Sequence, residues 1–239
     1  MLFLVMAIIF LATFIRSAFG FGEALVAVPL LALIMPIEIA APVAVLVSIT
    51  VAVVAVAQDW RHVHFRSAGV LFASTCVGIP IGLWLLTAVP GQTVKTVLAV
   101  VIIAFSAIFL FDRSRAMLKT DRWAPVFGFL AGILGGAYGM NGPPLVAYGT
   151  LRRWPPQRFR ATLQGYFLPA SVVIMLGYWL AGLWQPPVTR YYLLTLPVVI
   201  VAIVAGRAVN RRFDAQAFIT CVHAGLVVVG MALLWQARA

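Results

Sequence analysis

Long, uninterrupted runs of apolar residues follow one another along most of the chain. Several of them approach the ~20 residues that an α-helix needs to cross a bilayer. The strands of a membrane β-barrel would instead alternate between apolar and polar positions. The pattern therefore predicts an all-α polytopic membrane protein. The apolar runs are Met1–Ile15, Ala24–Met35, Ile39–Ala57, Ala68–Ala88, Val94–Phe111, Ala124–Tyr138, Leu145–Leu151, Ala161–Leu183, Tyr191–Ala205 and Ala217–Trp235.

The second half of the chain repeats the pattern of the first. The stretch "FLATFIRSAFG" from Phe10 aligns without a gap with "FLAGILGGAYG" from Phe129. We interpret this match as a duplication within one transmembrane domain, with repeat one at residues 1–111, a cytoplasmic linker at 112–122 and repeat two at 123–239. Each repeat holds about five hydrophobic segments. Further aligned pairs are Pro36 with Pro155 and, after a short insertion, Gly82 with Gly206.

The placement of basic residues predicts that the two repeats are inverted. The loop "MPIEI" of the first repeat has no Lys or Arg, whereas its counterpart "RRWPPQRFR" has four Arg. The loops "TAVPGQTVK" and "GRAVNRRFD" show the same bias. Because basic short loops stay cytoplasmic, equivalent loops lie on opposite sides, with both termini outside. The second segment of each repeat is short for a span of ~20 residues. The first two segments are therefore either two crossings or one re-entrant hairpin, which gives 8–10 membrane segments in all.

The composition excludes most other classes of protein. The chain is 64% hydrophobic and only 10% charged, whereas soluble domains carry roughly a quarter charged residues. The net charge of +11 does not indicate nucleic-acid binding, because the cations lie in short loops that meet lipid headgroups. Cys76 and Cys221 both lie in apolar runs. No nucleotide-binding motif or catalytic constellation is present, so we expect no enzyme, no cofactor and no metal site.

Two glycine-rich stretches, "FGFGE" and "YGMNGPP", occupy equivalent places between the first and second segments of the repeats. Gly20, Gly22, Gly139 and Gly142 release the backbone from helical geometry, and Pro143 cannot continue a preceding helix. Unwound backbone at membrane depth is tolerated where it lines a polar cavity. Paired breaks in inverted repeats indicate a transporter site near the midplane. The N-terminus of a helix at such a break favours an anion.

Two opposite charges flank the first of these stretches. A carboxylate within a membrane segment is a functional candidate, so Glu23 is either a proton-coupling site, a partner for a protonated substrate, or a residue that meets water near the interface. Arg16 pairs with Glu23 or binds a substrate anion. The interpretation that we favour for Arg16 is that it ends the first helix and extends to the cytoplasmic surface.

Other polar and small residues have a structural interpretation beside the functional one. Gln164 in "RATLQGYF" completes a shell around an oxyanion or links neighbouring helices. His223 relays protons or, as is more common for a lone histidine, packs through a hydrogen bond. The spacing of Gly128, Gly132 and Gly136 indicates close packing of two helices.

The stretches "AFGFGEALVAVPLL" and "GGAYGMNGPPLVAY", with the closing "GIPIGLWLL" and "VAGRAVNRRF", resemble the sulfite exporter family TauE/SafE, also known as the toluene sulfonate uptake permease family. The resemblance implies a secondary transporter of the bacterial inner membrane for sulfite, sulfonates or related organic anions. It places Glu23 and "NGPP" where the family often has a denser glycine run, which bears on the substrate more than on the fold. The candidate substrate-binding residues are Arg16, Gly20, Phe21, Gly22, Glu23, Tyr138, Gly139, Met140, Asn141, Gly142, Pro143 and Gln164.

Two other functions fit the same sequence. One is a passive anion channel, and the other is a membrane protein that assists the assembly or maturation of a partner complex. For a transporter, the expected partners are a small anionic substrate, the lipid bilayer and a coupling ion, either a proton or sodium. A homodimer is compatible with the sequence, although no residue points to it.

Overall fold

The computed structural model describes residues 1–59, 65–111, 118, 120–209 and 215–238. All regular structure within these residues is helical, which confirms the predicted fold class. The helices are α1 (Leu2–Phe19), α2 (Glu23–Ala32), α3 (Ile37–Asp59), α4 (Phe65–Ala88), α5 (Gly91–Phe111), η2 (Asp121–Trp123), α6 (Ala124–Tyr138), α7 (Gly142–Leu151), α8 (Pro156–Leu180), α9 (Pro186–Val209) and α10 (Ala215–Arg238).

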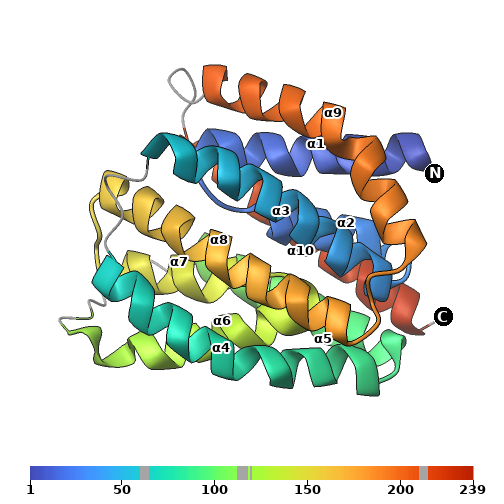
Figure 1. Ribbon diagram of the computed structural model, residues 1–239, viewed down its shortest axis with the longest axis horizontal. Coiled ribbons are helices and arrows are strands. Elements are labelled where there is room, and N and C mark those ends of the chain that lie inside the picture. The colour runs from blue at the N-terminus through green and yellow to red at the C-terminus, as the bar shows by residue number, and fades with distance from the viewer. Residues whose placement is uncertain (60–64, 112–117, 119, 210–214, 239) are drawn as a thin grey trace.

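The helices of the two halves are interleaved in one bundle. Figure 1 shows α1 and α9 along one edge and α4 and α6 along the opposite edge, with the remaining helices between them. Helix α1 packs on α9, and α6 packs on α4, so the first helix of each half contacts the fourth helix of the other half. The third helices, α3 and α8, pack together, as do the fifth helices, α5 and α10. Neither half therefore forms a separate bundle of its own.

Glycines bring the backbones of α4 and α6 into contact. A Cβ atom added at Gly132 would lie 2.3 Å from the carbonyl oxygen of Thr75, and one added at Gly136 would lie 2.3 Å from that of Ile79. Gly128 meets α4 in the same way. The interpretation of these three glycines as packing residues is therefore confirmed.

Equivalent glycines of the two halves make equivalent contacts. A Cβ added at Gly82 of α4 would meet the carbonyl oxygen of Ile133 at 2.1 Å, and one added at Gly206 of α9 would meet that of Phe14 at 2.7 Å. The alignment that pairs Gly82 with Gly206 also pairs Ile133 with Phe14. This correspondence supports the duplication, while the inversion of the repeats remains a prediction.

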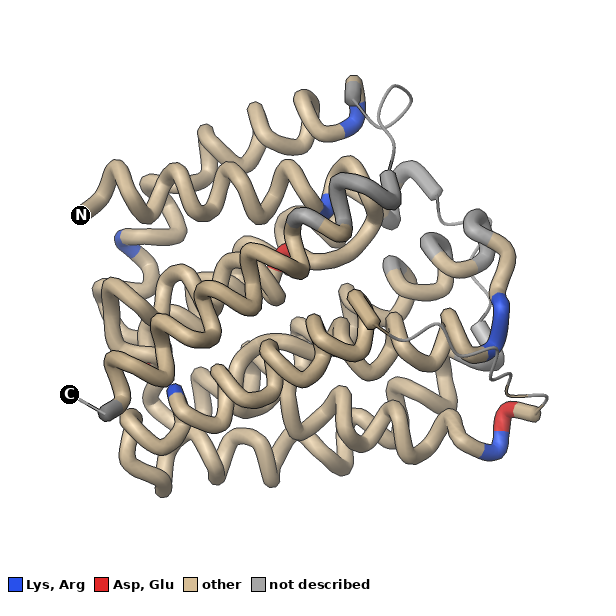
Figure 2. Tube along the Cα trace, turned by 180° about the vertical axis from the view of Figure 1, so that it is seen from behind, with Lys and Arg blue, Asp and Glu red and all other residues tan. Residues whose placement is uncertain are grey.

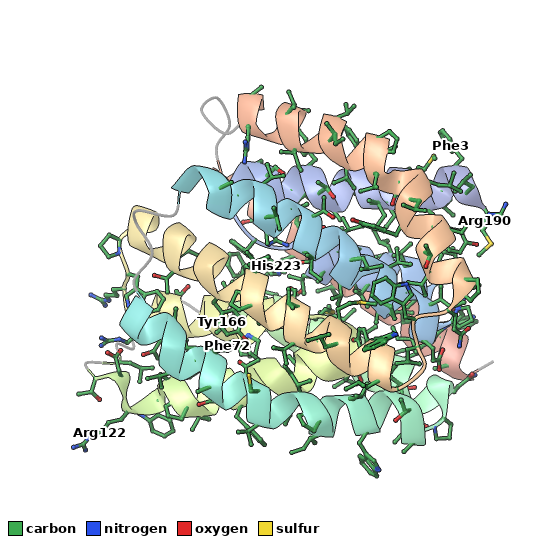
Figure 3. All side chains as sticks on the ribbon, in the orientation of Figure 1. Phe3, Phe72, Arg122, Tyr166, Arg190 and His223 are labelled. Carbon is green, nitrogen blue, oxygen red and sulfur yellow. The ribbon has the colours of Figure 1, made fainter. Side chains whose placement is uncertain are left out.

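The two ends of the bundle differ in charge. Both termini lie at one end, and the connection between α7 and α8 lies at the other (Figure 1). Lys, Arg, Asp and Glu are drawn mainly at the two ends, and most of the length between them is uncharged (Figure 2). Arg122 and Arg190 mark opposite ends in Figure 3. Arg152 and Arg153, which follow α7, and Arg207, in the last turn of α9, belong to the end away from the termini. By the rule that basic short loops stay inside, that end is the predicted cytoplasmic one.

Helix lengths distinguish full spans from partial ones. Within the described residues, five helices are long and apolar enough to cross a membrane: α1, α3, α4, α5 and α9. Helices α2 and α7 have 10 residues each, which corresponds to about 15 Å, half of the ≈ 30 Å hydrocarbon thickness. These lengths make α2 and α7 too short to cross on their own, whereas α1 is long enough, so the re-entrant alternative for the first two segments remains a prediction.

Candidate functional site

Glycines lie at both helix breaks, the one between α1 and α2 and the one between α6 and α7. Gly20 caps the C-terminus of α1 with φ 89°, and its N–H donates to the Arg16 carbonyl at 2.7 Å. Gly22, with φ 98°, precedes α2. Gly139 caps α6 with φ 66°. Residues with a side chain rarely adopt positive φ, so the sequence fixes where the helices stop.

The two breaks meet at one cavity of about 30 Å³. Such a volume holds roughly two water molecules. Three helices that lie far apart in the sequence, α3, α5 and α8, complete its wall. The lining residues are Arg16, Phe21, Gly22, Glu23, Ala24, Leu25, Ser48, Phe105, Asn141, Gly142, Pro143, Val146 and Phe167.

A buried ion pair lies at this cavity. The Arg16 Nη1 atom donates to Glu23 Oε2 at 2.5 Å and to Ser48 Oγ at 2.5 Å. The guanidinium carbon lies 5.1 Å from the centre of the Phe167 ring, in a cation–π contact. Arg16 is only 3% exposed and Glu23 only 2%. The interpretation that Arg16 extends to the membrane surface is therefore wrong: the end of α1 is covered by α3 and α8, and the carboxylate of Glu23 compensates the charge there.

A carboxylate oxygen and an amide nitrogen of the site have no hydrogen-bond partner within the described part of the chain. They are Glu23 Oε1, an acceptor, and Asn141 Nδ2, a donor. Both side chains are buried, with Asn141 5% exposed. Buried polar atoms are nearly always paired in proteins, so these two atoms make the cavity a candidate ligand site.

The N-termini of the two short helices differ in the donors that they offer. The first four N–H groups of any α-helix lack a partner within the helix. Gly22, Glu23, Ala24 and Leu25 all line the cavity at the start of α2. In α7, by contrast, "GPP" opens the helix, and two prolines have no N–H. The side-chain amide of Asn141 is therefore the principal donor that this break adds.

The charges of the site all come from the first half. In the gap-free alignment, Arg16 corresponds to Gly135, Glu23 to Gly142, and Ser48 to Phe167. The second half thus supplies small or apolar residues where the first half supplies a charge or a hydroxyl. This asymmetry leaves one ion pair in a site built by two equivalent breaks.

The structure brings together seven of the predicted site residues at the cavity and leaves others outside its wall. Tyr138 is buried and donates its hydroxyl to the Val94 carbonyl at 3.0 Å. Met140 is buried in the main apolar core, and Gly20 and Gly139 act as helix caps. The side chain of Gln164 lies outside the described residues. The seven at the cavity are Arg16, Phe21, Gly22, Glu23, Asn141, Gly142 and Pro143.

Sequence reasoning missed six residues that complete the site: Ala24, Leu25, Ser48, Phe105, Val146 and Phe167. A signal was present for two of them, because the alignment places Ser48 opposite Phe167. Nothing in the local sequence marks Phe105. His223, the other candidate, bonds Ser106 at 3.2 Å and stacks on Phe109; it is a packing residue between α5 and α10.

A family model described as sulfite exporter TauE/SafE matches residues 5–233, almost the whole chain. No curated protein and no solved structure shows a significant match to it.

Proposed function

Because the chain belongs to the sulfite exporter TauE/SafE family, whose members transport sulfite-type anions across membranes, we propose that it carries a small oxyanion by alternating access around the two helix breaks. Sulfite, a sulfonate or a related organic anion is the substrate. The chain is a multi-pass protein of the cell inner membrane, as the family and its five long apolar helices show.

One observation carries this proposal: both helix breaks and a buried Arg–Glu pair line the same cavity. A fixed guanidinium is the side-chain group best suited to bind an oxyanion, because its planar N–H groups can donate to two oxygens at once. Ser48 and Phe167 hold the Arg16 guanidinium in place. Such preorganisation lowers the cost of ordering the site when an anion binds.

Glu23 has two tasks in this mechanism. Without substrate it compensates Arg16, whose charge would otherwise be uncompensated in the apolar interior. With substrate present, the anion takes over part of that compensation, and the site then carries an excess negative charge. A proton on or near Glu23 removes this excess, which makes Glu23 the candidate for proton coupling.

The membrane potential decides when coupling is needed. Moving one elementary charge through 100 mV contributes about 2.3 kcal/mol, so an anion leaving a negative cytoplasm is already driven outward. Uptake requires a coupled proton or sodium ion. The direction of transport is thus tied to whether the Glu23 site takes up a proton in each cycle.

Flux into liposomes that hold the purified protein tests the function. The panel contains sulfite, thiosulfate, sulfonates and small carboxylates, each with and without a pH gradient. We expect saturable flux of one class, with trans-stimulation, that is lost in Gly22→Val and Asn141→Leu. Gly69→Val is the matched control, because an added Cβ at Gly69 meets no atom within 4 Å. Flux without saturation would identify a channel, and no flux from folded protein would favour the assembly role.

A second variant tests the coupling. In Glu23→Gln we expect flux to persist while its dependence on the pH gradient disappears, because the amide cannot take up a proton. Glu38→Gln provides the control, since Glu38 lines a separate hollow beside Lys95 at the opposite end of α2. Unchanged coupling in Glu23→Gln would rule out Glu23 as the coupling site.

A further inference from the structure

The carboxylate oxygen and the amide nitrogen that lack a partner call for a ligand with both a hydrogen-bond donor and an acceptor. Glu23 Oε1 needs a donor, and Asn141 Nδ2 needs an acceptor. Both side chains are at least nine-tenths buried and line the same cavity. An anion that has only acceptor oxygens would satisfy Asn141 and Arg16 but leave the Glu23 oxygen facing another negative oxygen. A buried acceptor left in that state weakens binding considerably.

The charges around the cavity favour a single negative charge on the ligand. Among the described lining residues, Arg16 of α1 is the one cation and Glu23 the one anion. Of the other elements that pack on α2, α3 contributes Ser48, α5 contributes Phe105, and the break before α7 contributes Asn141, all uncharged. Helix α10 also packs on α2 but adds no described residue to the wall, and its His223 bonds Ser106 of α5. One cation therefore faces the fixed carboxylate and the ligand together, and a dianion is repelled more strongly than a monoanion.

The size of the cavity limits the ligand further. A volume of about 30 Å³ has room for roughly two water-sized groups, and Phe21, Pro143 and Phe167 border it. Small inorganic oxyanions are the class of anion nearest to this size. An aromatic or long aliphatic substituent would require the break itself to open.

Building on the function proposed above, we propose that the site selects a small, singly charged oxyanion that carries an O–H group. The ligand's O–H donates to Glu23 Oε1, and its remaining oxygens accept from Arg16 and from Asn141 Nδ2. Within the sulfite class the ion with this chemistry is hydrogen sulfite, HO–SO₂⁻, and not the fully deprotonated sulfite dianion.

This arrangement accounts for a proton in the transport cycle. The proton lies between the ligand oxygen and Glu23 Oε1, so the same complex forms whether the proton arrives on the ion or on the carboxyl group. One proton then accompanies each ion across the membrane. The two routes differ only in the order of binding.

A matched pair of ligands tests the selectivity on the unaltered protein. Methanesulfinate, CH₃–SO₂⁻, has nearly the shape and charge of hydrogen sulfite but has a methyl group in place of the hydroxyl. By calorimetric titration of the purified protein at mildly acidic pH, we expect hydrogen sulfite to bind about tenfold more tightly or better. As the pH rises through neutrality, the apparent affinity for the sulfite pool falls, because the O–H form is lost. Methanesulfinate keeps its single charge over this range, so its affinity changes only as far as Glu23 itself takes up a proton.

Variants show which side chain carries the preference. In Glu23→Gln, we expect the ratio of the two affinities to fall toward one, while Glu38→Gln leaves it unchanged. Equal binding of the two ions by the unaltered protein, with both weakened in Arg16→Lys, would overturn the inference and leave the anion site intact. Absence of binding and flux for both ions would overturn the proposed function as well. The comparison on the unaltered protein decides the question even where a variant fails to fold.

Discussion

At the scale of single residues, we expect the Arg16–Glu23 pair to govern both stability and binding. The side chains of Arg16 and Glu23 are only 3% and 2% exposed. In this apolar interior, each charge is neutralised by the other. Removing one partner of such a pair leaves a buried charge and costs about 3–5 kcal/mol, whereas replacing both by apolar residues is often neutral.

We therefore expect Glu23→Leu to lower the apparent Tm in detergent strongly, and Arg16→Met combined with Glu23→Leu to restore much of the loss. The destabilisation by the single variant should be of the order of 3–5 kcal/mol. Glu38→Leu, at a partly exposed position, is the control for loss of a carboxylate. Additive losses in the double variant would show that the pair is not coupled.

Variants at two glycines of the break between α6 and α7 distinguish an effect on folding from an effect on transport. A Cβ at Gly139 would lie 2.6 Å from Val45 Cγ2, and its φ of 66° is unfavourable for other residues, whereas a Cβ at Gly142 lies no closer than 3.8 Å to Phe167. Gly139→Ala should thus reduce the amount of folded protein. Gly142→Ala should fold normally and reduce flux severalfold, because its methyl group occupies a cavity that holds about two waters. Expression, size-exclusion profile and liposome flux check both; normal flux in Gly142→Ala would contradict the placement of the site.

At the scale of elements, the contact between α4 and α6 depends on the absence of side chains. The backbones approach so closely that a methyl group at Gly132 would lie 2.3 Å from a carbonyl oxygen. No flexible side chain can move aside there, so the helices themselves must separate. Van der Waals packing of small residues is a main source of helix association in membranes.

Gly132→Ala should accordingly destabilise the fold by about 1–3 kcal/mol, the usual cost of overpacking. Gly225→Ala, on the exposed face of α10 with no atom within 4 Å of the added Cβ, should be neutral or slightly stabilising. Thermal unfolding in one detergent, measured for both variants side by side, checks the difference. Equal melting temperatures would mean that α4 and α6 are not held as closely as described.

At the scale of the whole molecule, the distribution of charge predicts the orientation in the membrane. At the end that carries the termini, Gln92 lies beside the hollow near Lys95 and donates to the Ala237 carbonyl. The opposite end holds Arg122, which follows Thr120 by two residues (Figure 3). Gln92 and Thr120 are both exposed. They therefore form a matched pair of labelling positions at the two ends.

With Cys76 and Cys221 replaced by Ala, a membrane-impermeant thiol reagent added to intact cells should label Gln92→Cys and not Thr120→Cys. Permeabilised cells should show both. The physical reason is the retention of basic connections in the cytoplasm. Labelling of Thr120→Cys alone in intact cells would reverse the predicted orientation.

Much of this protein was determined by its sequence alone. The apolar runs predicted the helices, because a backbone in hydrocarbon must satisfy its own hydrogen bonds. The glycines predicted the breaks, because positive φ at Gly20, Gly22 and Gly139 is accessible mainly to glycine. These are local requirements, and each can be recognised within a few residues of the chain.

Only the tertiary structure decided which of these parts meet. Helix α1 packs against the second half and α6 against the first. Arg16 contacts Ser48 and Phe167, which are remote from it in sequence. An apolar helix fits many neighbours equally well by composition. The choice among them depends on the shapes of whole helix faces, and on where a glycine allows two backbones to touch. The surface position expected for Arg16 was wrong for this reason: its burial depends on helices that a local pattern cannot place.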